Sequence, residues 1–351
     1  MKLKKQIRII ILTISVIFAS GCKNKGINPS DNMQYKKDFY AMDTYMTFTA
    51  YGKNGEKGIE EAKKRIEEIE KIFSVTDSKS EVYTVNHRTE NTIEVSRELM
   101  DMLEHALTIS RNSEGAFDIS VYPVVKAWGF TTGNYRVPSE AEIKDLLKKV
   151  GYDKIQTDNQ INTVTLEPDM EIDFGGIAKG YSGDEAVRVL KECGVDSAIL
   201  SLGGNIQALG SKPDGSAWNI AVRNPEDTDG YMGILKVRDK AVVTSGGYER
   251  FFEAEDGQIY WHILNPKTGY PAKQGLISVT VVGDCGMDCD ALSTALFVQG
   301  LEGASNYWKK YKNFEAVLVT DEHEMYITEG LQDMFEAKGE YEKKEVKVIK
   351  K

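Results

Sequence analysis

Two residues of one predicted helix, Asp290 and Thr294, have suitable types and spacing to hold a divalent cation. They are four positions apart, so they share one face of the helix predicted from Asp290 to about Gln299. A carboxylate and a hydroxyl are hard oxygen ligands, which suit Mg²⁺ when substrate phosphates complete its shell. The structural alternative is that Asp290 caps the helix while Thr294 bonds back to its carbonyl. This segment alone favours that alternative.

The cysteines before this helix do not make a zinc site. Cys285, Asp288 and Cys289 are close in sequence, but no second cysteine pair or nearby histidine completes four ligands. The few cysteines of the chain do not form a disulfide framework either. Whether Cys285 and Cys289 pair with each other stays open.

A second segment, Asp173-Phe174-Gly175-Gly176-Ile177-Ala178-Lys179-Gly180, could approach an anion. Adjacent glycines between a strand end and a helix let the backbone come close to a ligand, and a helix N-terminus favours negative charge. Lys179 adds a cation. The segment is neither a Walker A loop nor a dinucleotide fingerprint, because the required glycine spacing is absent. By itself, a glycine turn before a helix is more often plain turn chemistry.

Two further segments carry candidate groups. His262, one of four histidines, precedes the turn Asn265-Pro266-Lys267-Thr268-Gly269 and is a candidate acid, base or phosphate donor. A lone histidine is still more often structural. Gly115-Ala116-Phe117-Asp118, with Trp128 and Phe130 shortly after, could hold a flat heterocycle, but core packing explains these aromatic residues equally well.

The elements that must position these residues mix helices and strands without a regular alternation. Helices are predicted by apolar spacing over 58–73, 96–110 and 178–193. Strands are predicted over 45–51, 172–174, 198–202, 218–222, 241–244, 277–282, 315–319 and 324–327. The absence of a βαβ rhythm predicts a single α+β domain rather than a doubly wound sheet.

The first 22 residues have the layout of an export signal. Basic residues precede the apolar run Ile9 to Ala19, which is too short to cross a bilayer. Ala19-Ser20-Gly21-Cys22 resembles the lipobox of bacterial lipoproteins. That resemblance implies diacylation of Cys22 and attachment to the extracytoplasmic face of the cell membrane. An ordinary cleaved signal with a chance cysteine is the alternative. Residues 1–21 are predicted to be removed, and the polar residues 22–34 to form a flexible tether.

The acidic composition argues against nucleic acid as a partner. The chain has 44 Lys and Arg against 54 Asp and Glu, and the predicted signal removes four cations and no acid. Because Lys and Arg supply the attraction to phosphate, such a chain is repelled by nucleic acid. The length allows a sizeable core, predicted over 35–337, with a charged and frayed tail over 338–351.

The order of eight segments resembles the ApbE family, the FAD:protein FMN transferases. The resemblance covers about residues 41–327 and implies a T-fold-related α+β fold of mixed sheets with packed helices. The segments are Met42-Asp43-Thr44, the serines 74 and 80 with Glu81 and Asn86, Gly115–Asp118, Asp173–Gly180, Leu202–Asn205, Thr244–Arg250, His262–Pro271 and Asp290–Ala295.

The resemblance implies a reaction and assigns residues to it. FAD would bind with Mg²⁺ on its pyrophosphate, and a threonine of an exported flavoprotein would attack the FMN phosphorus and release AMP. Asp290, Thr294 and a backbone carbonyl of Gly176 would hold the metal. His262 and Lys179 are the candidates for activating the exchange, and the general base stays open. The implied FAD contacts are Met42, Tyr83, Ala116, Phe117, Asp118, Asp173, Lys179, His262 and Leu264.

Two positions depart from the family pattern. Asp43 stands where the family often has glycine, and Thr76 stands where it often has an aromatic residue. Stacking on the isoalloxazine would then come from elsewhere, with Tyr83 as a candidate. Two other functions stay open: a Mg²⁺-dependent FAD pyrophosphatase, and a non-catalytic flavin-binding lipoprotein. The pairing of Asp290 with Thr294 argues against the carrier, which has less need for a metal at the scissile bond.

Overall fold

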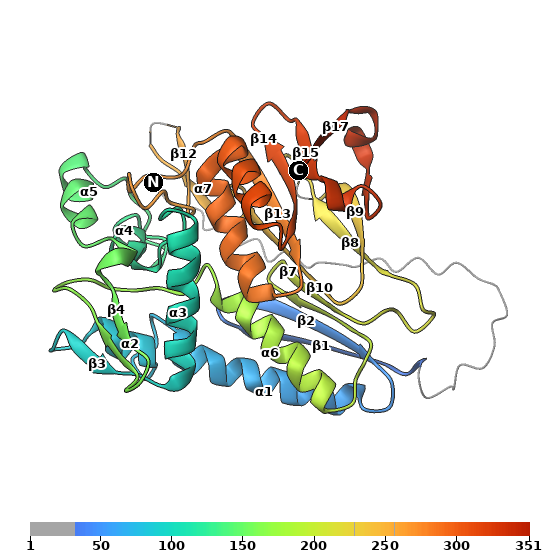
Figure 1. Cartoon of the computed structure of the whole chain (residues 1–351), viewed down its shortest axis with the longest axis horizontal. Coiled ribbons are helices and arrows are strands. Elements are labelled where there is room, and N and C mark those ends of the chain that lie inside the picture. The colour runs from blue at the N-terminus through green and yellow to red at the C-terminus, as the bar shows by residue number, and fades with distance from the viewer. Residues whose placement is uncertain (1–31, 228, 256) are drawn as a thin grey trace, which may run out of the picture.

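A nine-stranded sheet runs through the centre of the computed structural model, which describes residues 32–227, 229–255 and 257–351 (Figure 1). The order is β1-β2-β6-β7-β10-β13-β14-β15-β17, and neighbours are antiparallel except for β15 and β17. The strands are β1 (Gln34–Ala41), β2 (Thr44–Tyr51), β6 (Ala198–Leu202), β7 (Asn205–Leu209), β10 (Lys240–Gly246), β13 (Leu276–Gly283), β14 (Glu315–Thr320), β15 (Met325–Thr328) and β17 (Val346–Ile349).

Three long helices pack on one face of this sheet. They are α1 (Gly55–Phe73), α6 (Ala178–Glu192) and α7 (Gly286–Tyr311). Apolar residues recur along α1 at helical spacing, and its fully buried Ile59, Ala62 and Ile66 share a core with Met46 and Phe48 of β2. The predicted helices 58–73 and 178–193 are therefore confirmed in type and place.

A three-stranded sheet covers part of the other face. It consists of β8 (Trp218–Arg223), β9 (Tyr231–Val237) and β16 (Phe335–Ala337). Alternate residues of β8, including Trp218 and Ile220, are buried and share a core with Val242, Val282 and Val317 of the large sheet. The large sheet is thus buried on both faces in this region, which explains the nearly continuous apolar sequence of β13.

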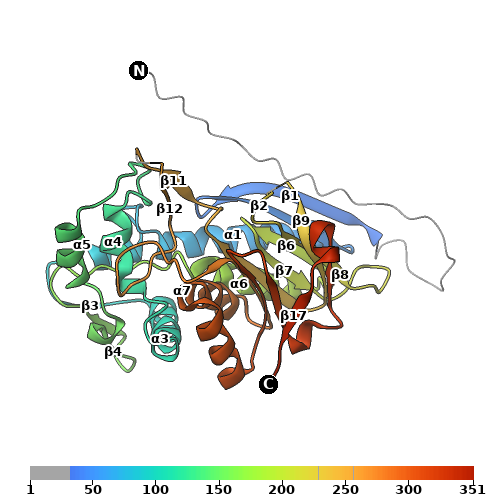
Figure 2. The same cartoon turned by 90° about the horizontal axis from the view of Figure 1, so that it is seen from above.

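A smaller group of elements lies beside α7, to the left in Figure 1. Three of its four α-helices begin at serine caps, because the hydroxyls of Ser80, Ser96 and Ser139 each accept from a backbone N–H three residues later. A separate hairpin joins the segments that carry Arg250 and His262 (Figure 2). The elements are β3 (Thr92–Glu94), β4 (Gln156–Asp158), β5 (Thr163–Thr165), α2 (Glu81–Asn86), α3 (Arg97–Asn112), α4 (Tyr122–Ala127) and α5 (Glu140–Leu147), with β11 (Phe251–Glu253) and β12 (Ile259–Trp261) in the hairpin.

The mixed α+β class is confirmed, and two predicted elements differ in detail. Residues 172–174 do not form a strand. Instead of a neighbouring strand, the side chain of Asn86 donates to the carbonyl of Ile172 and accepts from its N–H, both at 2.8 Å. Helix α7 begins four residues before Asp290. The backbone of Gly300 is non-helical (φ 73°, ψ −179°), so the helical run that carries Asp290 ends there as predicted, and a second helical run follows it after a kink.

The chain after residue 337 is part of the fold, so the prediction of a frayed tail is wrong. Strand β17 pairs with β15 in parallel, and the ring of Tyr341 is fully buried. Lysines dominate the composition of this segment, but Val346 and Val348 alternate with them and pack against the core under β15.

The predicted signal, Cys22 and almost all of the predicted tether lie outside the described residues. At the end of the tether, the carbonyl of Met33 accepts a hydrogen bond from the N–H of Gly52, and β1 begins at Gln34. Within the part of the chain that the structure describes, no helix combines the length and apolarity that a membrane span requires.

Candidate active site

Helices α6 and α7 approach each other at glycines, and this contact places Asp290. A Cβ atom on Gly180 would lie 2.1 Å from the carbonyl oxygen of Gly286, so only glycine fits at this point. The N–H of Gly180 donates to Oδ2 of Asp290 at 2.8 Å. The buried carboxylate is thereby held beside the first turn of α6.

The start of α7 is capped by a residue of α6. Asp184 accepts from the N–H of Gly286 at 2.7 Å and from the N–H of Met287 at 2.9 Å. Burial raises the pKa of Asp184, and these hydrogen bonds oppose the rise. A carboxylate that accepts from free N–H groups at a helix N-terminus is stabilising. Helix α6 therefore fixes both the start of α7 and its Asp290.

Thr294 and Gly176 lie together on the side of α7 that faces the glycine turn. A Cβ atom on Gly176 would lie 3.7 Å from Oγ1 of Thr294. The same oxygen is 3.4 Å from Oγ of Ser245, which hydrogen-bonds to Ser293 at 2.7 Å. Asp290 does not cap the helix, because it lies inside it. The hydroxyl that donates to the backbone carbonyl of Asp290 belongs to Ser293 and not to Thr294, so the purely structural explanation of this pair is wrong in both parts.

This donor set fits Mg²⁺ rather than zinc. Among the described residues, no three His, Cys, Asp or Glu side chains gather as a metal site. A cation here would take a carboxylate oxygen of Asp290, the hydroxyl of Thr294 and a backbone oxygen of Gly176. Mg²⁺ commonly binds through one or two carboxylates and keeps the remaining positions for water and substrate phosphates, whereas a structural zinc site needs four nitrogen or sulfur ligands.

Lys179 projects from the first turn of α6 beside the glycine turn. Its Nζ is 3.3 Å from the carbonyl of Gly175, and Asp173 accepts from the N–H of Gly175 at 2.9 Å. Desolvation raises the pKa of Asp173, while the nearby charges of Lys179 and Arg250 oppose the rise. An amine and a helix N-terminus next to a glycine turn make a local positive site in an acidic protein.

His262 is held in one tautomer. Its backbone N–H lies 3.0 Å and its Nδ1 3.1 Å from the carbonyl oxygen of Arg250. A carbonyl can only accept, so Nδ1 carries the proton and Nε2 keeps its lone pair. Desolvation and the charge of Arg250 lower the pKa of His262 to about 4. The imidazole is therefore neutral at neutral pH and able to accept a proton through Nε2.

One charged residue near these groups, Glu249, was missed from the sequence. Desolvation raises its pKa to about 7, with Lys179 and Arg223 opposing the rise and Asp290 adding to it. Glu249 is therefore near enough to Lys179 and Asp290 for their charges to act on it. The segment Thr244–Arg250 was recognised, but an acid between Tyr248 and Arg250 has the sequence appearance of ordinary surface.

The other predicted FAD contacts divide into two groups. Met42 and Phe117 lie near the site, because Sδ of Met42 is 3.1 Å from the hydroxyl of Ser182 on α6 and a Cβ on Gly176 would be 3.2 Å from the ring of Phe117. Ala116 is buried beside Phe117 in the same core.

The second group already has protein partners. Asp118 accepts from the N–H and hydroxyl of Ser120 and from the N–H of Tyr152, so both of its oxygens hold local structure. The ring of Tyr83 stacks on His87 with centroids 3.8 Å apart. Leu264 is buried in an aromatic cluster with Trp128. Their contact with FAD stays a prediction.

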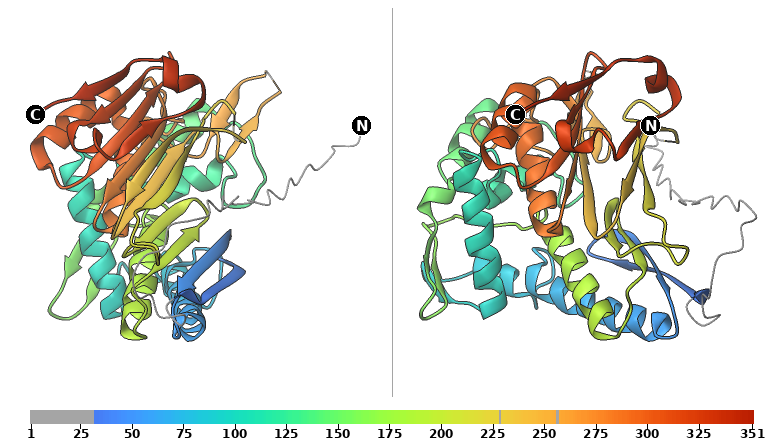
Figure 3. Two further views of the ribbon diagram at one scale, coloured as in Figure 1. Left: turned by 90° about the vertical axis from the view of Figure 1, so that its right-hand side faces the viewer. Right: turned by 45° about the vertical axis from the view of Figure 1, so that its right-hand side comes forward.

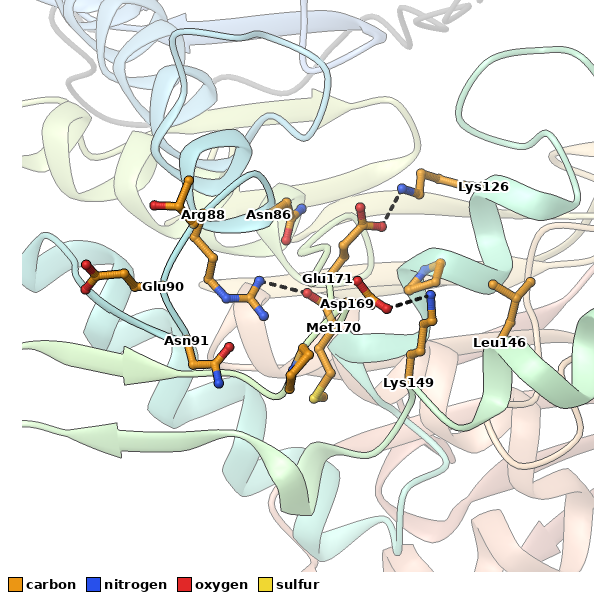
Figure 4. Close-up of a pocket in the computed structure, with 13 residues that line it drawn as sticks. Asn86, Arg88, Glu90, Asn91, Lys126, Leu146, Lys149, Asp169, Met170 and Glu171 are labelled. Carbon is orange, nitrogen blue, oxygen red and sulfur yellow. Dashed lines mark hydrogen bonds and ion pairs between the residues drawn. The ribbon is translucent and has the colours of Figure 1, made fainter.

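A hollow is lined in part by the segment that leads to Asp173, residues 168–171 (Figure 4). It has a volume of about 420 Å³ and shares no residue with the predicted site. Arg88 donates to the carbonyls of Met170 and Glu167 at its wall. The lysines that line it are paired, Lys126 with Glu171 and Lys149 with Asp169. Both lysines of the hollow are therefore already paired with carboxylates, and Arg88 is the lining cation that contacts carbonyls instead.

Comparison with known proteins identifies the family. Residues 42–318, most of the chain, match the ApbE family. The chain belongs to the ApbE family. The FAD:protein FMN transferase of Klebsiella pneumoniae is 32% identical over 266 residues, which cover 75% of this chain and 82% of that protein. The FAD:protein FMN transferase of Treponema pallidum is 32% identical over 291 residues, covering 78% and 80%.

Solved ApbE structures share the fold described above. The ApbE protein of Thermotoga maritima superposes with a TM-score of 0.80 at 30% identity, covering 86% of this chain and 99% of that one. The flavinyl transferase ApbE of Pseudomonas stutzeri, in its apo form, gives 0.77 at 27% identity, covering 88% and 98%. The expectation of an ApbE-like single domain is confirmed.

Proposed function

We propose that this chain, as an FAD:protein FMN transferase, depends on Mg²⁺ and moves FMN from FAD onto a threonine hydroxyl of an exported flavoprotein, with release of AMP. The observation that carries the proposal is the contact of α6 with α7, which gathers Asp290, Thr294 and Gly176 beside Lys179. The activity of the ApbE relatives, which align with three quarters or more of this chain, supports it.

The substrate pyrophosphate would lie against the glycine turn. A strongly acidic protein repels a dinucleotide, so the attraction has to be local. The amine of Lys179 and the N-terminus of α6 supply it. Phosphoryl transfer depends mainly on positioning and charge neutralisation. Because Lys179 and the N-terminus of α6 are fixed on one helix turn, they would supply both to the pyrophosphate.

Asp290, Thr294 and the Gly176 carbonyl would hold Mg²⁺ at this turn. The chemistry that the bound ion supplies is neutralisation of charge on the two phosphates. The hydrogen bond from Gly180 and the cap from Asp184 keep these protein oxygens in place before substrate arrives. The residues of the chain thus prepare an oxygen-lined position that only a phosphate-bearing substrate would complete.

His262 would accept the proton of the acceptor. The threonine oxygen forms a bond to the FMN phosphorus, the bond from that phosphorus to the AMP oxygen breaks, and the threonine proton passes to Nε2. The tautomer fixed by the Arg250 carbonyl supports this role, because it leaves Nε2 unprotonated. AMP leaves as an anion that Lys179 can stabilise.

The site would work outside the cytoplasm. The basic and apolar N-terminal residues and Cys22 support export and lipid attachment at the cell membrane. The acceptor would then be an exported flavoprotein, most simply a component of a membrane electron-transfer system. To test the anchor, the wild type and Cys22→Ser are compared by cell fractionation. The wild type should stay in the membrane fraction, and the variant should be released from it.

One assay separates the possible activities. The full chain, purified in detergent, is incubated with FAD, Mg²⁺ and exported proteins from cells that lack the transferase. Flavin fluorescence on a protein band in a denaturing gel, with threonine carrying FMN by mass spectrometry, is the expected result. Free FMN and AMP without labelled protein would indicate the pyrophosphatase. Intact FAD after long incubation would indicate a carrier.

A further inference from the structure

Exposed aromatic and aliphatic side chains stand on two hairpins that flank the candidate active site. Tyr40 and Tyr45 are 68% and 53% exposed, and Phe251 and Ile259 are each 47% exposed. The first pair belongs to the β1–β2 hairpin and the second to the β11–β12 hairpin, and both hairpins lie on the same side of the molecule (Figures 2 and 3). We call these four residues the rim.

Each pair of rim residues presents a continuous surface. Tyr40 and Tyr45 face each other across the β1–β2 ladder, so both rings stand on one face, while Phe39 and Met46 point into the core. On the second hairpin, Phe251 and Ile259 share a face with Trp261, and the opposite face carries Phe252 and Tyr260, which pack against Trp128. Trp261 is partly buried against Phe297 with Lys273 over its ring, whereas the four rim side chains are exposed within the described chain.

The rim is continuous with the catalytic groups. Phe251 directly follows Arg250, whose carbonyl holds His262, and Trp261 directly precedes His262. The ring of Trp261 packs against Gly247, because a Cβ atom on Gly247 would lie 3.0 Å from that ring. Gly247 belongs to the segment that carries Glu249. On the other hairpin, desolvation and nearby carboxylates raise the pKa of Tyr40, and the charge of Arg250 opposes the rise. Arg250 therefore lies within reach of both hairpins.

We propose that the rim is the docking surface for the threonine-bearing segment of the acceptor protein, bound in extended form across the two hairpins. The inference rests on the proposed function, because a transferase to protein must admit a polypeptide at its catalytic group. FAD would bind at the buried α6–α7 contact, whereas large exposed apolar residues beside it are typical of a surface that binds protein.

The edge strand β1 supports an extended partner. It is the outermost strand of the large sheet, so one side of its backbone is unpaired. Its lysines, Lys36 and Lys37, stand in its first half and Asp38 opens its second half, whereas the end of the strand carries Phe39 and Tyr40. Charges of this kind discourage strand addition where they occur. The uncharged end of the strand, residues 39–41, is the part left open for an incoming strand, with apolar acceptor side chains against the tyrosines.

The test changes two rim residues and leaves the residues of the candidate active site unchanged. The full chain and its double variant Tyr40→Ser with Phe251→Ser are compared for FAD affinity and for transfer to a peptide that spans the FMN-bearing threonine of a protein labelled by the wild type. We expect KM for the peptide to rise about tenfold, because exposed aromatic anchors carry much of the energy of such interfaces. FAD affinity and the rate at saturating peptide should stay unchanged. Tyr231→Ser is the matched control, since Tyr231 is 50% exposed on the remote strand β9.

Each other outcome contradicts the proposal in a distinct way. Normal transfer with an unchanged KM would overturn the docking surface alone. An unchanged KM with weaker association with phosphatidylethanolamine and phosphatidylglycerol vesicles would assign the rim to the membrane. Loss of FAD affinity would assign it to the flavin. A wild-type chain that hydrolyses FAD without labelling any protein would overturn both this surface and the proposed function.

Discussion

The α6–α7 contact and the rim of the two hairpins differ in burial and in polarity, although both belong to one candidate site. The contact is buried and packed at glycines, and its groups are fixed by hydrogen bonds from backbone N–H groups. The rim is exposed and apolar, and it is uncovered within the described residues. The difference indicates that the two regions bind different substrates. The rigid α6–α7 contact suits the small, charged FAD, and the accessible rim suits the acceptor protein.

The largest effect is expected from removing the carboxylate at the contact. Asp290→Ala should lower FMN transfer by at least about a hundredfold, the usual cost of losing one preorganised charge-stabilising group. The fold should persist, which circular dichroism checks. Asp288→Ala is the matched control, because Asp288 lies half-exposed on the same helix and pairs with His105 outside the site. Equal losses in the two variants would contradict a special role for Asp290.

The second prediction concerns the proton acceptor. His262→Gln should lower the transfer rate by about a hundredfold or more, since general base catalysis contributes at least that factor. The base works when neutral, so kcat/KM for FAD in the wild type should fall only as the pH drops through about 4, the lowered pKa of His262. An acid limb near 6.5, the ordinary histidine value, that persists in a Glu249→Gln variant would contradict the desolvated site.

A control variant distinguishes His262 from Glu249, the second group near the site with a shifted pKa. The pKa of Glu249 is raised to about 7, so a rate change near neutral pH would come from this carboxyl. Glu249→Gln should remove such a change and leave the limb near pH 4 in place. A limb near pH 4 that disappears in this variant would show that the assignment to His262 is wrong.

The third prediction tests the close packing of the two helices. Gly180→Ala places a methyl group 2.1 Å from the carbonyl oxygen of Gly286, so the helices must separate. The variant should lose about 1–3 kcal/mol of unfolding free energy and much of its Mg²⁺-dependent activity. At Gly183 the nearest atoms to an added methyl belong to the buried side chain of Gln207, at 2.7 Å, and not to backbone, so Gly183→Ala should cost less in a denaturant titration. A reversed order would disprove the contact as the rigid element.

The smallest effect on activity is expected far from both regions. Tyr341→Ala removes a fully buried ring next to β17 and should destabilise the fold by about 3 kcal/mol, as for other large-to-small changes in a core. Transfer per folded molecule should not change, because the ring lies under the opposite side of the sheet. Thermal unfolding and a rate corrected for folded protein measure the two effects. An altered rate with unchanged stability would mean that the C-terminal segment acts on the site.

Local patterns in the sequence predicted the elements that carry the site. Apolar spacing and capping serines located α1 and α3, and the spacing of Asp290 and Thr294 predicted their shared helix face. The glycine turn before α6 was also visible. These features depend on residues close together in sequence, which is the range over which pattern and propensity act.

Long-range partners explain what the sequence could not indicate. The start of α7 is set by Asp184, about a hundred residues earlier in the chain, so no local signal marks it. Asn86 replaces a strand partner for Ile172, which explains why a strand-like segment forms no strand. The raised pKa of Glu249 arises first from desolvation, and the charges that modify it, Lys179, Arg223 and Asp290, lie on three separate segments. The frayed tail was predicted from lysine content, which hid the alternating valines of β17.

Calorimetric titration of the full chain with FAD, with and without Mg²⁺, tests the central claim most directly. The account predicts that Mg²⁺ tightens FAD binding to the wild type, and that Asp290→Ala binds FAD with the same affinity whether or not Mg²⁺ is present. An equal gain from Mg²⁺ in both proteins would show that the cation is held elsewhere and would contradict the α6–α7 site.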